Sequence, residues 1–143
     1  MSGLFTRVLV ATDGSENNRA AVDEALRIGR ACKAPVHAVY VIDVKGMESA
    51  PADIVMVGDA WDLVQNEAAE ILSRIRDRAE GVTLETMTLE GKPAAEILRY
   101  AKENEIDLIV IGTRGKRGLE RIVLGSVAED IIRNASCRVL VVK

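Results

Sequence analysis

The sequence is poor in aromatic, cysteine and histidine residues, and this restricts what it can do. Aromatic residues make up 3% of the 143 residues, so platforms for stacking nucleic-acid bases are nearly absent. The two cysteines, Cys32 and Cys137, stand far apart, and His37 is the single histidine, which argues against a Cys/His zinc site. A formal net charge of -3 gives no general attraction to nucleic acid or to an anionic membrane.

Long apolar runs are also missing. No run approaches the roughly 20 residues that a helix needs to span a bilayer, and the first residues lack the basic and apolar regions of a signal peptide. We therefore expect a cytoplasmic protein with reduced thiols and with neither a membrane nor a nucleic-acid partner. A length of 143 residues predicts one domain, 1–143, with a substantial core.

Apolar patterns alternate between two periods along the chain. Runs rich in β-branched residues predict five strands, at 7–12, 36–42, 82–89, 107–111 and 138–142. Helical spacing between them predicts four helices, the first with Ala21, Ala25, Ile28 and Cys32 on one face. Its start would be capped by Asp13 or Ser15. The other helices are expected from about Ala60, from Pro93 at its first position, and from Gly125-Ser126 with Val127, Ile131 and Ile132 lining it.

This alternation predicts the fold class. Continuous apolar strands joined by helical crossovers favour a parallel sheet covered on both faces. Right-handed crossovers then favour a doubly wound, flavodoxin-like α/β fold with five strands in the order 3-2-1-4-5. In that fold, ligands bind outside the carboxyl ends of the strands, where the winding reverses.

A glycine-rich loop follows the fourth strand. Gly112 ends the strand, two residues separate it from Gly115, and nine more separate Gly115 from Gly125-Ser126, which opens the last helix. Glycines allow the backbone to approach a ligand closely, and a helix start offers unpaired N–H donors, so this order predicts an anion site. The spacing matches neither a P-loop nor the GxGxxG dinucleotide motif.

The carboxyl ends of all the strands should meet at one rim, which brings 12–15, 41–43 and 112–115 to the start of the last helix. There the glycine loop would hold phosphates, and Asp13 would accept from an adenine amino group or a ribose hydroxyl. Each of these residues also has an explanation that needs no ligand. Ser126 and Glu129 form a capping-box pattern, Asp13 is a common turn residue, and single glycines occur in ordinary turns.

The opening residues 8–15, the glycine spacing and the closing residues 137–142 together resemble the universal stress protein family over nearly the whole chain. The intact glycine signature is similar to that of the family's ATP-binding branch. That resemblance implies ATP as the ligand, often with a divalent ion such as Mg or Mn on its phosphates, and slow hydrolysis if any. It also implies a homodimer in which the last strand, 138–142, pairs with its copy, as an exposed apolar edge invites.

The resemblance assigns residues to the nucleotide. Asp13 and the backbone of Val41 would contact adenine, with Ala11 and Thr12 lining the same pocket. The ribose and phosphates would be held by Gly112, Arg114, Gly115, Gly125, Ser126 and Val127.

Together these observations predict an ATP-binding module for regulation or signalling in stress. The alternatives are a slow ATPase whose turnover is the function, and a dimeric partner-binding module without ATP. The residues offer no obvious general base and no nucleophile–base pair, which argues against fast catalysis. The aperiodic segment 44–59 is a candidate lid, and the basic run of Arg114, Lys116, Arg117 and Arg121 is expected to be solvated, with Arg114 near phosphate.

Overall fold

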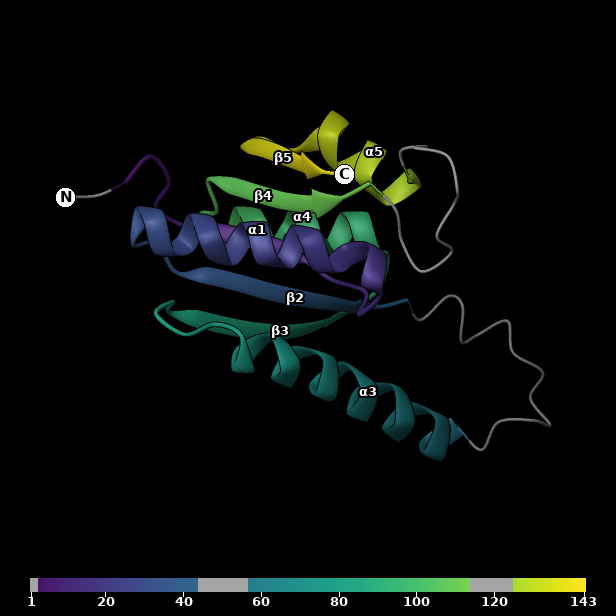
Figure 1. Ribbon diagram of the computed structural model, residues 1–143. Coiled ribbons are helices and arrows are strands. Elements are labelled where there is room, and N and C mark those ends of the chain that lie inside the picture. Colours follow the sequence, from purple (N-terminus) through teal and green to yellow (C-terminus); the bar gives the residue numbers. More distant parts are fainter. Residues whose placement is uncertain (1–2, 44–56, 114–124) are drawn as a thin grey trace.

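The computed structural model describes residues 3–43, 57–113 and 125–143. Within these ranges, five parallel strands form one sheet in the order β3-β2-β1-β4-β5 (Figure 1). The strands are β1 (Val8–Ala11), β2 (Val36–Ile42), β3 (Leu84–Glu90), β4 (Leu108–Gly112) and β5 (Arg138–Val142). The helices are α1 (Glu16–Cys32), α3 (Val57–Asp77), α4 (Pro93–Glu103) and α5 (Ser126–Asn134). The predicted flavodoxin-like fold and its strand order are confirmed.

Helices cover both faces of the sheet. α1 and α3 pack on one face, against residues that include Val8, Val10 and Ala38. α4 and α5 pack on the other face, against Leu9 and Ile109. In Figure 1, α1 crosses in front of the sheet and α4 lies behind it. No helix in the described parts of the chain is long and apolar enough to cross a membrane.

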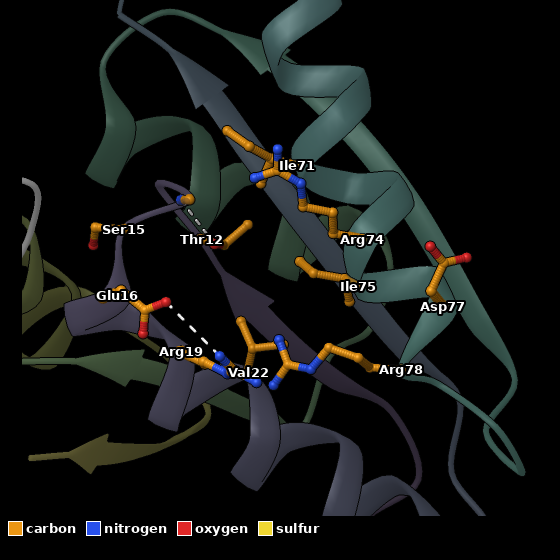
Figure 2. A pocket seen from close by; sticks show the side chains of 11 residues that line it. Thr12, Ser15, Glu16, Arg19, Val22, Ile71, Arg74, Ile75, Asp77 and Arg78 are labelled. Carbon is orange, nitrogen blue, oxygen red and sulfur yellow. Dashed lines mark hydrogen bonds and ion pairs between the residues drawn. The ribbon is translucent and has the colours of Figure 1, made fainter.

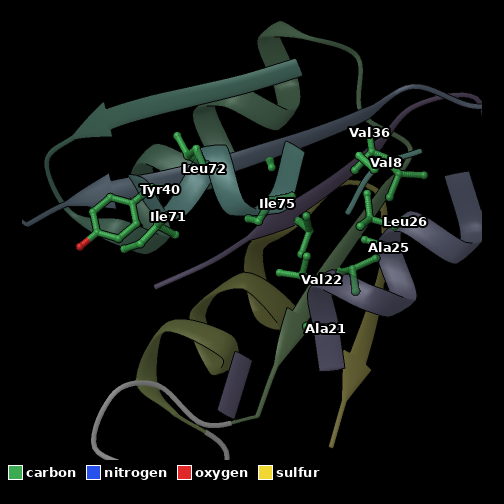
Figure 3. Packing of buried hydrophobic residues seen from close by; sticks show 14 of the residues in the cluster. Val8, Ala21, Val22, Ala25, Leu26, Val36, Tyr40, Ile71, Leu72 and Ile75 are labelled. Atoms are coloured by element: carbon green, nitrogen blue, oxygen red, sulfur yellow. The ribbon is translucent and has the colours of Figure 1, made fainter. Parts of the chain in front are cut away.

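The two central strands form the core of the molecule. Val8, Leu9, Val10, Ile109 and Val110 have no exposed surface, and burying an aliphatic side chain of this size contributes about 1.5–3 kcal/mol. Figure 3 shows the same layer from the side of α1 and α3, whose apolar residues point towards the strands. The buried stripe of α1 is wider than the sequence predicts, because Val22 and Leu26 join Ala21 and Ala25.

The last helix uses a different face from the predicted one. Ile131 is buried as expected, but Val127 is 38% and Ile132 is 43% exposed, while Ala128 is buried. α5 has only nine residues and lies at one end of the sheet. A narrow stripe at 128 and 131 is therefore enough to cover the strands beneath it, and the flanking apolar residues stay outside.

Local signals placed most element ends correctly. Pro93 lies in the first turn of α4, as predicted, and Asn104 is the C-cap of that helix. Gly81 does not end α3, which stops at Asp77. Gly81 instead has a φ of 80° in a turn closed by the hydrogen bond from the Val82 N–H to the Ala79 carbonyl, 3.0 Å. This turn delays β3, which begins at residue 84 rather than at 82.

A carboxylate ties the segment before β1 to the start of β4. Asp107 accepts hydrogen bonds from the backbone N–H groups of Thr6 and Arg7, at 2.8 and 3.0 Å, and from the Thr6 hydroxyl at 2.9 Å. Burial of the carboxyl group raises its pKa, but these hydrogen bonds outweigh burial, and the net pKa of Asp107 is lowered. The charged carboxylate therefore fixes the point where two neighbouring strands begin.

His37 is buried near the start of β2, at the opposite end of the sheet from the predicted site. Its Nδ1 lies 2.8 Å from the Tyr100 hydroxyl oxygen and 3.3 Å from Oε2 of Glu85 on β3. Burial lowers the pKa of His37, the Glu85 carboxylate partly opposes this, and Arg7 adds to the lowering. The neutral imidazole is therefore the form that the fold favours.

The folded state should lose stability as the pH falls through this titration. Because the pKa of His37 is lower in the folded than in the unfolded chain, its contribution to stability is complete above about pH 6.5 and is lost as the pH falls below that value. Urea unfolding between pH 7.5 and 5 measures this slope. His37→Gln should flatten the slope, whereas Tyr100→Phe, which leaves the imidazole buried, should keep it. An unchanged slope in His37→Gln would assign the pH dependence to other groups.

Candidate nucleotide site

The carboxyl ends of β1, β2 and β4 open on one rim of the sheet, seen at the right of Figure 1. β1 lies between β2 and β4, so the chain reverses its winding direction between β1 and β4. The helices that follow these two strands lie on opposite faces, because α1 covers one face and α5 the other. A crevice at such a reversal is the usual ligand site of open α/β sheets.

The turn between β1 and α1 is fixed by its own side chains. The Thr12 N–H donates to the Val39 carbonyl at 2.9 Å, and the Thr12 hydroxyl accepts from the Gly14 N–H at 3.1 Å. Asp13 Oδ1 accepts from both the N–H and the hydroxyl of Ser15, at 2.9 and 2.6 Å. Ser15 is the N-cap of α1 by backbone position, but its side chain makes no capping bond. Asp13 thus fixes the turn between β1 and α1 through one of its two carboxylate oxygens.

Gly14 holds this turn against α3. Its φ is 80°, a conformation that favours glycine. A Cβ atom at this position would lie 2.5 Å from Cδ1 of Ile71 on α3. The turn that carries Asp13 is therefore in direct contact with α3, and its position depends on where that helix packs.

Neighbouring residues at the end of β1 point to opposite faces of the sheet. Ala11 and Val41 are half-buried and pack with the α4 and α5 side of the core. Thr12 is 8% exposed and lines a cavity on the α1 and α3 side. The structure thus brings Ala11 and Val41 together on one face and turns the Thr12 side chain to the other.

The two described ends of the glycine loop meet directly. Thr113 follows Gly112, and its N–H donates to the carbonyl of Val142 on β5 at 3.2 Å. Its own carbonyl accepts from the Gly125 N–H at 3.0 Å. The end of β4 and the start of α5 are thereby held side by side. The predicted contacts Arg114 and Gly115, the rest of the basic run, and 44–56 of the candidate lid lie outside the described residues.

The start of α5 does not contain the capping box that the sequence suggests. Gly125 is the N-cap, and its carbonyl accepts from the Glu129 N–H at 3.0 Å. Ser126 is the first helical residue, and the helix has no side-chain capping bond. Ser126 and Val127 are both exposed. The structural explanation for a serine at position 126 is therefore wrong, because its hydroxyl caps nothing.

Sequence patterns missed a cavity near the rim. A cavity of about 370 Å³ lies between α1 and α3 (Figure 2). Helical spacing places residues on a face but does not say which helices approach each other, so no local signal pointed to it. Its lining consists of Thr12, Gly14, Ser15, Glu16, Arg19, Val22, Ile71, Arg74, Ile75, Asp77 and Arg78.

A doubly wound sheet with helices on both faces and a glycine-serine helix start at its winding reversal defines a flavodoxin-like domain. The profile of the universal stress protein family matches residues 4–143. The chain belongs to that family, as the sequence resemblance predicted.

Similar proteins agree with this assignment. Universal stress protein MJ0531 of Methanocaldococcus jannaschii is 43% identical over 98% of this chain and 83% of its own length. The solved structure of MJ0577, from the same organism, has a TM-score of 0.86 and is 27% identical over 98% of this chain and 96% of its own. A universal stress protein solved in complex with cAMP has a TM-score of 0.72, with 27% identity over 96% of both chains.

Replacing Gly14 tests how tightly the turn is held against α3. Gly14→Ala should lower the free energy of unfolding by about 1–3 kcal/mol, because the left-handed backbone strains a Cβ atom and Ile71 blocks it. Denaturant unfolding measures the loss. In an Ile71→Ala background the same substitution should cost less, since only the backbone strain remains. Equal costs in the two backgrounds would mean that Ile71 does not limit the space at this position.

Proposed function

We propose that this protein binds ATP at the reversal between β1 and β4 and acts as a regulatory or signalling module in the stress response. In this proposal hydrolysis is slow or absent. The observation that carries it is the start of α5, where the exposed Ser126 hydroxyl makes no capping bond and the Gly125 backbone adopts angles open to any residue. The competing functions are a slow ATPase, which turnover of Mg-ATP distinguishes, and a partner-binding dimer without ATP, which a failure to bind ATP distinguishes.

Gly125 has no conformational reason to be glycine. Its φ is -64° and its ψ is 157°, which any residue adopts. Among the described residues, a Cβ atom there would meet only the Thr113 carbonyl, at an ordinary 3.5 Å. Glycine also lets a backbone approach a ligand closely, as phosphate loops require. Together with the uncapped Ser126 hydroxyl, this supports a phosphate at the helix start.

The proposed contacts follow the predicted division of the site. Asp13 and the backbone of Val41 would hold adenine, beside Ala11. Thr12 would reach this pocket through its backbone, because its side chain lines the cavity on the other face. The ribose and phosphates would contact the glycine signature and the start of α5, at Gly112, Arg114, Gly115, Gly125, Ser126 and Val127. A neighbour of the same family solved with cAMP supports an adenine nucleotide as the ligand class. A divalent ion such as Mg²⁺ or Mn²⁺ would be carried on the phosphates.

The distribution of titratable groups favours binding over fast turnover. His37 lies five residues before the end of β2, about 16 Å from the rim at 3.3 Å per residue. It is buried against Tyr100 there and cannot serve as a base for a nucleotide at the rim. Asp13, which does lie at the rim, already accepts two hydrogen bonds within its turn. These positions support a module in which the bound nucleotide, rather than its hydrolysis, carries the signal.

The nucleotide is tested first on freshly purified protein. Denaturation should release ATP or ADP, and titration of the stripped protein with Mg-ATP should show one site. Ser126→Ala should weaken ATP binding by about tenfold or more, because a hydrogen bond to a charged phosphate oxygen is lost. Gly125→Val should weaken it further by filling the space of the phosphate, with little change in thermal unfolding.

The matched control is Ser136→Ala, an exposed serine beyond the other end of α5, which should bind ATP like the parent. No binding at millimolar ATP would overturn the proposal and leave the dimeric interaction module. Turnover of Mg-ATP faster than about one per second, the low end for enzymes, would favour the ATPase instead.

The free edge of the sheet supports the predicted homodimer. Within the described residues β5 pairs only with β4, and its four valine and leucine residues are half-buried rather than buried. Val127 and Ile132 of α5 are also exposed. An apolar edge strand with unpaired backbone groups favours pairing with a second strand. We propose that two copies pair through Arg138–Val142.

The backbone of β5 allows a selective test of that pairing. The Val142 carbonyl accepts a hydrogen bond from the Thr113 N–H at the end of β4. Because backbone groups alternate in direction along a strand, the N–H and carbonyl of Val141 point to the free edge. Val141→Pro removes an N–H at the free edge without removing a bond to β4. The dimer dissociation constant, measured by analytical ultracentrifugation, should rise by at least about tenfold. The circular dichroism spectrum should remain that of a folded chain.

Val141→Ala is the control, because it trims the side chain but keeps the N–H, and it should remain dimeric. A folded Val141→Pro variant that dimerises as strongly as the parent would exclude β5 pairing. A parent that is monomeric at micromolar concentration would do the same.

A further inference from the structure

The cavity between α1 and α3 includes Thr12 in its lining but lies on the opposite face of the sheet from Ala11 and Val41. Its volume, about 370 Å³, falls in the range of small-molecule sites. An adjoining cavity of about 330 Å³ shares Ser15 and Arg74 with it and extends to Asp13. The hollow therefore follows α3 along the turn between β1 and α1, on the side opposite to Ala11 and Val41.

One wall of this cavity is aliphatic. Val22 comes from α1, and Ile71 and Ile75 come from α3. All three belong to the apolar core on this face and are at most 9% exposed. The Thr12 hydroxyl lies at the end of the same wall. This wall offers contact to an apolar body but few polar partners, because the Thr12 hydroxyl already bonds the Gly14 N–H.

The opposite part of the lining is cationic. Figure 2 shows the side chains of Arg19 and Arg78 converging from α1 and α3, while Asp77 points away from them. Burial and then the nearby Arg19 charge lower the pKa of Arg78, and Glu16 opposes this in part. Two guanidinium groups that repel each other beside an apolar wall would gain from an anion placed between them.

The existing ion pairs do not saturate these arginines. A guanidinium group has five N–H donors. Arg19 approaches Glu16 with Nη1 alone, at 3.7 Å, which is beyond hydrogen-bond distance. Arg78 pairs with Asp23 through Nη2. Each cation therefore keeps donors that a bound anion can use, and bidentate pairing is the arrangement that guanidinium groups favour with carboxylates.

We propose that this cavity binds a small amphipathic carboxylate, with its charged group between Arg19 and Arg78. Its compact apolar body would contact the wall formed by Val22, Ile71 and Ile75. The site lies beyond the proposed nucleotide function and does not depend on it. Because Gly14 contacts α3 beside the cavity, the ligand would sit against the helix that supports the Asp13 turn.

Octanoate is a suitable probe, titrated into the full chain and followed by the chemical shifts of backbone amides. We expect one saturable site with a dissociation constant of about 0.1–1 mM, as expected for a ligand of this size. The shifts should map to the first turns of α1 and to residues 71–78. Acetate, which is only the charged group, and 1-octanol, which is only the body, should each bind at least about tenfold more weakly.

Two variants and a matched control assign the charged group. Arg19→Gln and Arg78→Gln should each weaken octanoate binding by about tenfold. Arg27→Gln removes the same charge from an exposed position of α1 outside the cavity, and its affinity should stay within about twofold. Arg19 is exposed, so its variant keeps the test valid if Arg78→Gln fails to fold.

The outcomes separate this site from the nucleotide site. Saturating ATP should leave octanoate affinity unchanged, and absence of ATP binding would overturn the proposed function without affecting this proposal. Displacement of octanoate by ATP, or shifts that map to Val41 and α5, would overturn it. The carboxylate site would also be overturned if Arg19→Gln and Arg27→Gln lost octanoate affinity equally, or if acetate bound as strongly as octanoate.

Discussion

Parallel pairing of β1 with β4 is the constraint on which the other features of this molecule depend. Val8, Leu9 and Val10 lie opposite Leu108, Ile109 and Val110. All of these side chains except that of Leu108 have no exposed surface. Since β2 occupies the other side of β1, the chain must reverse its winding here. The turn with Asp13 and the helix start at Gly125 are brought to one rim only because these two strands, far apart in sequence, lie side by side.

The alternation of side chains along β1 divides this rim between the two faces of the sheet. Ala11 faces the side of α4 and α5, and Thr12 faces the side of α1 and α3. A shift of one residue in the register would exchange them and expose the apolar set of the strand. The burial that fixes the register therefore also decides which surface each rim residue serves. Thr12 therefore lines the cavity between α1 and α3, whereas Ala11, one residue earlier, packs with the other layer of helices.

Local patterns predicted what local physics determines. The strand order followed from continuous apolar runs and right-handed crossovers, Pro93 marked a helix start, and the Glu70 to Arg74 pair forms at 2.5 Å as helical spacing predicts. The exposed Val127 and the delayed start of β3 were missed, because each depends on how much surface a neighbouring element covers. The meeting of Arg19 with Arg78 was missed for the same reason, since they come from helices whose approach no single pattern encodes. The uncapped Ser126 shows a local motif overruled by backbone position, with Gly125 taking the cap.

The hydrogen bond from the Gly125 N–H to the Thr113 carbonyl has a consequence for how the family can diversify. It closes the chain between these residues at its base, so β4 and α5 keep their places whatever peptide is inserted there. Doubling the length of a closed flexible segment costs only about 0.6 kcal/mol in chain entropy. A change of length between residues 113 and 125 is therefore expected to leave the pairing of β4 and the packing of α5 in place. The contacts proposed at Arg114 and Gly115 would confine such changes to the residues that follow them.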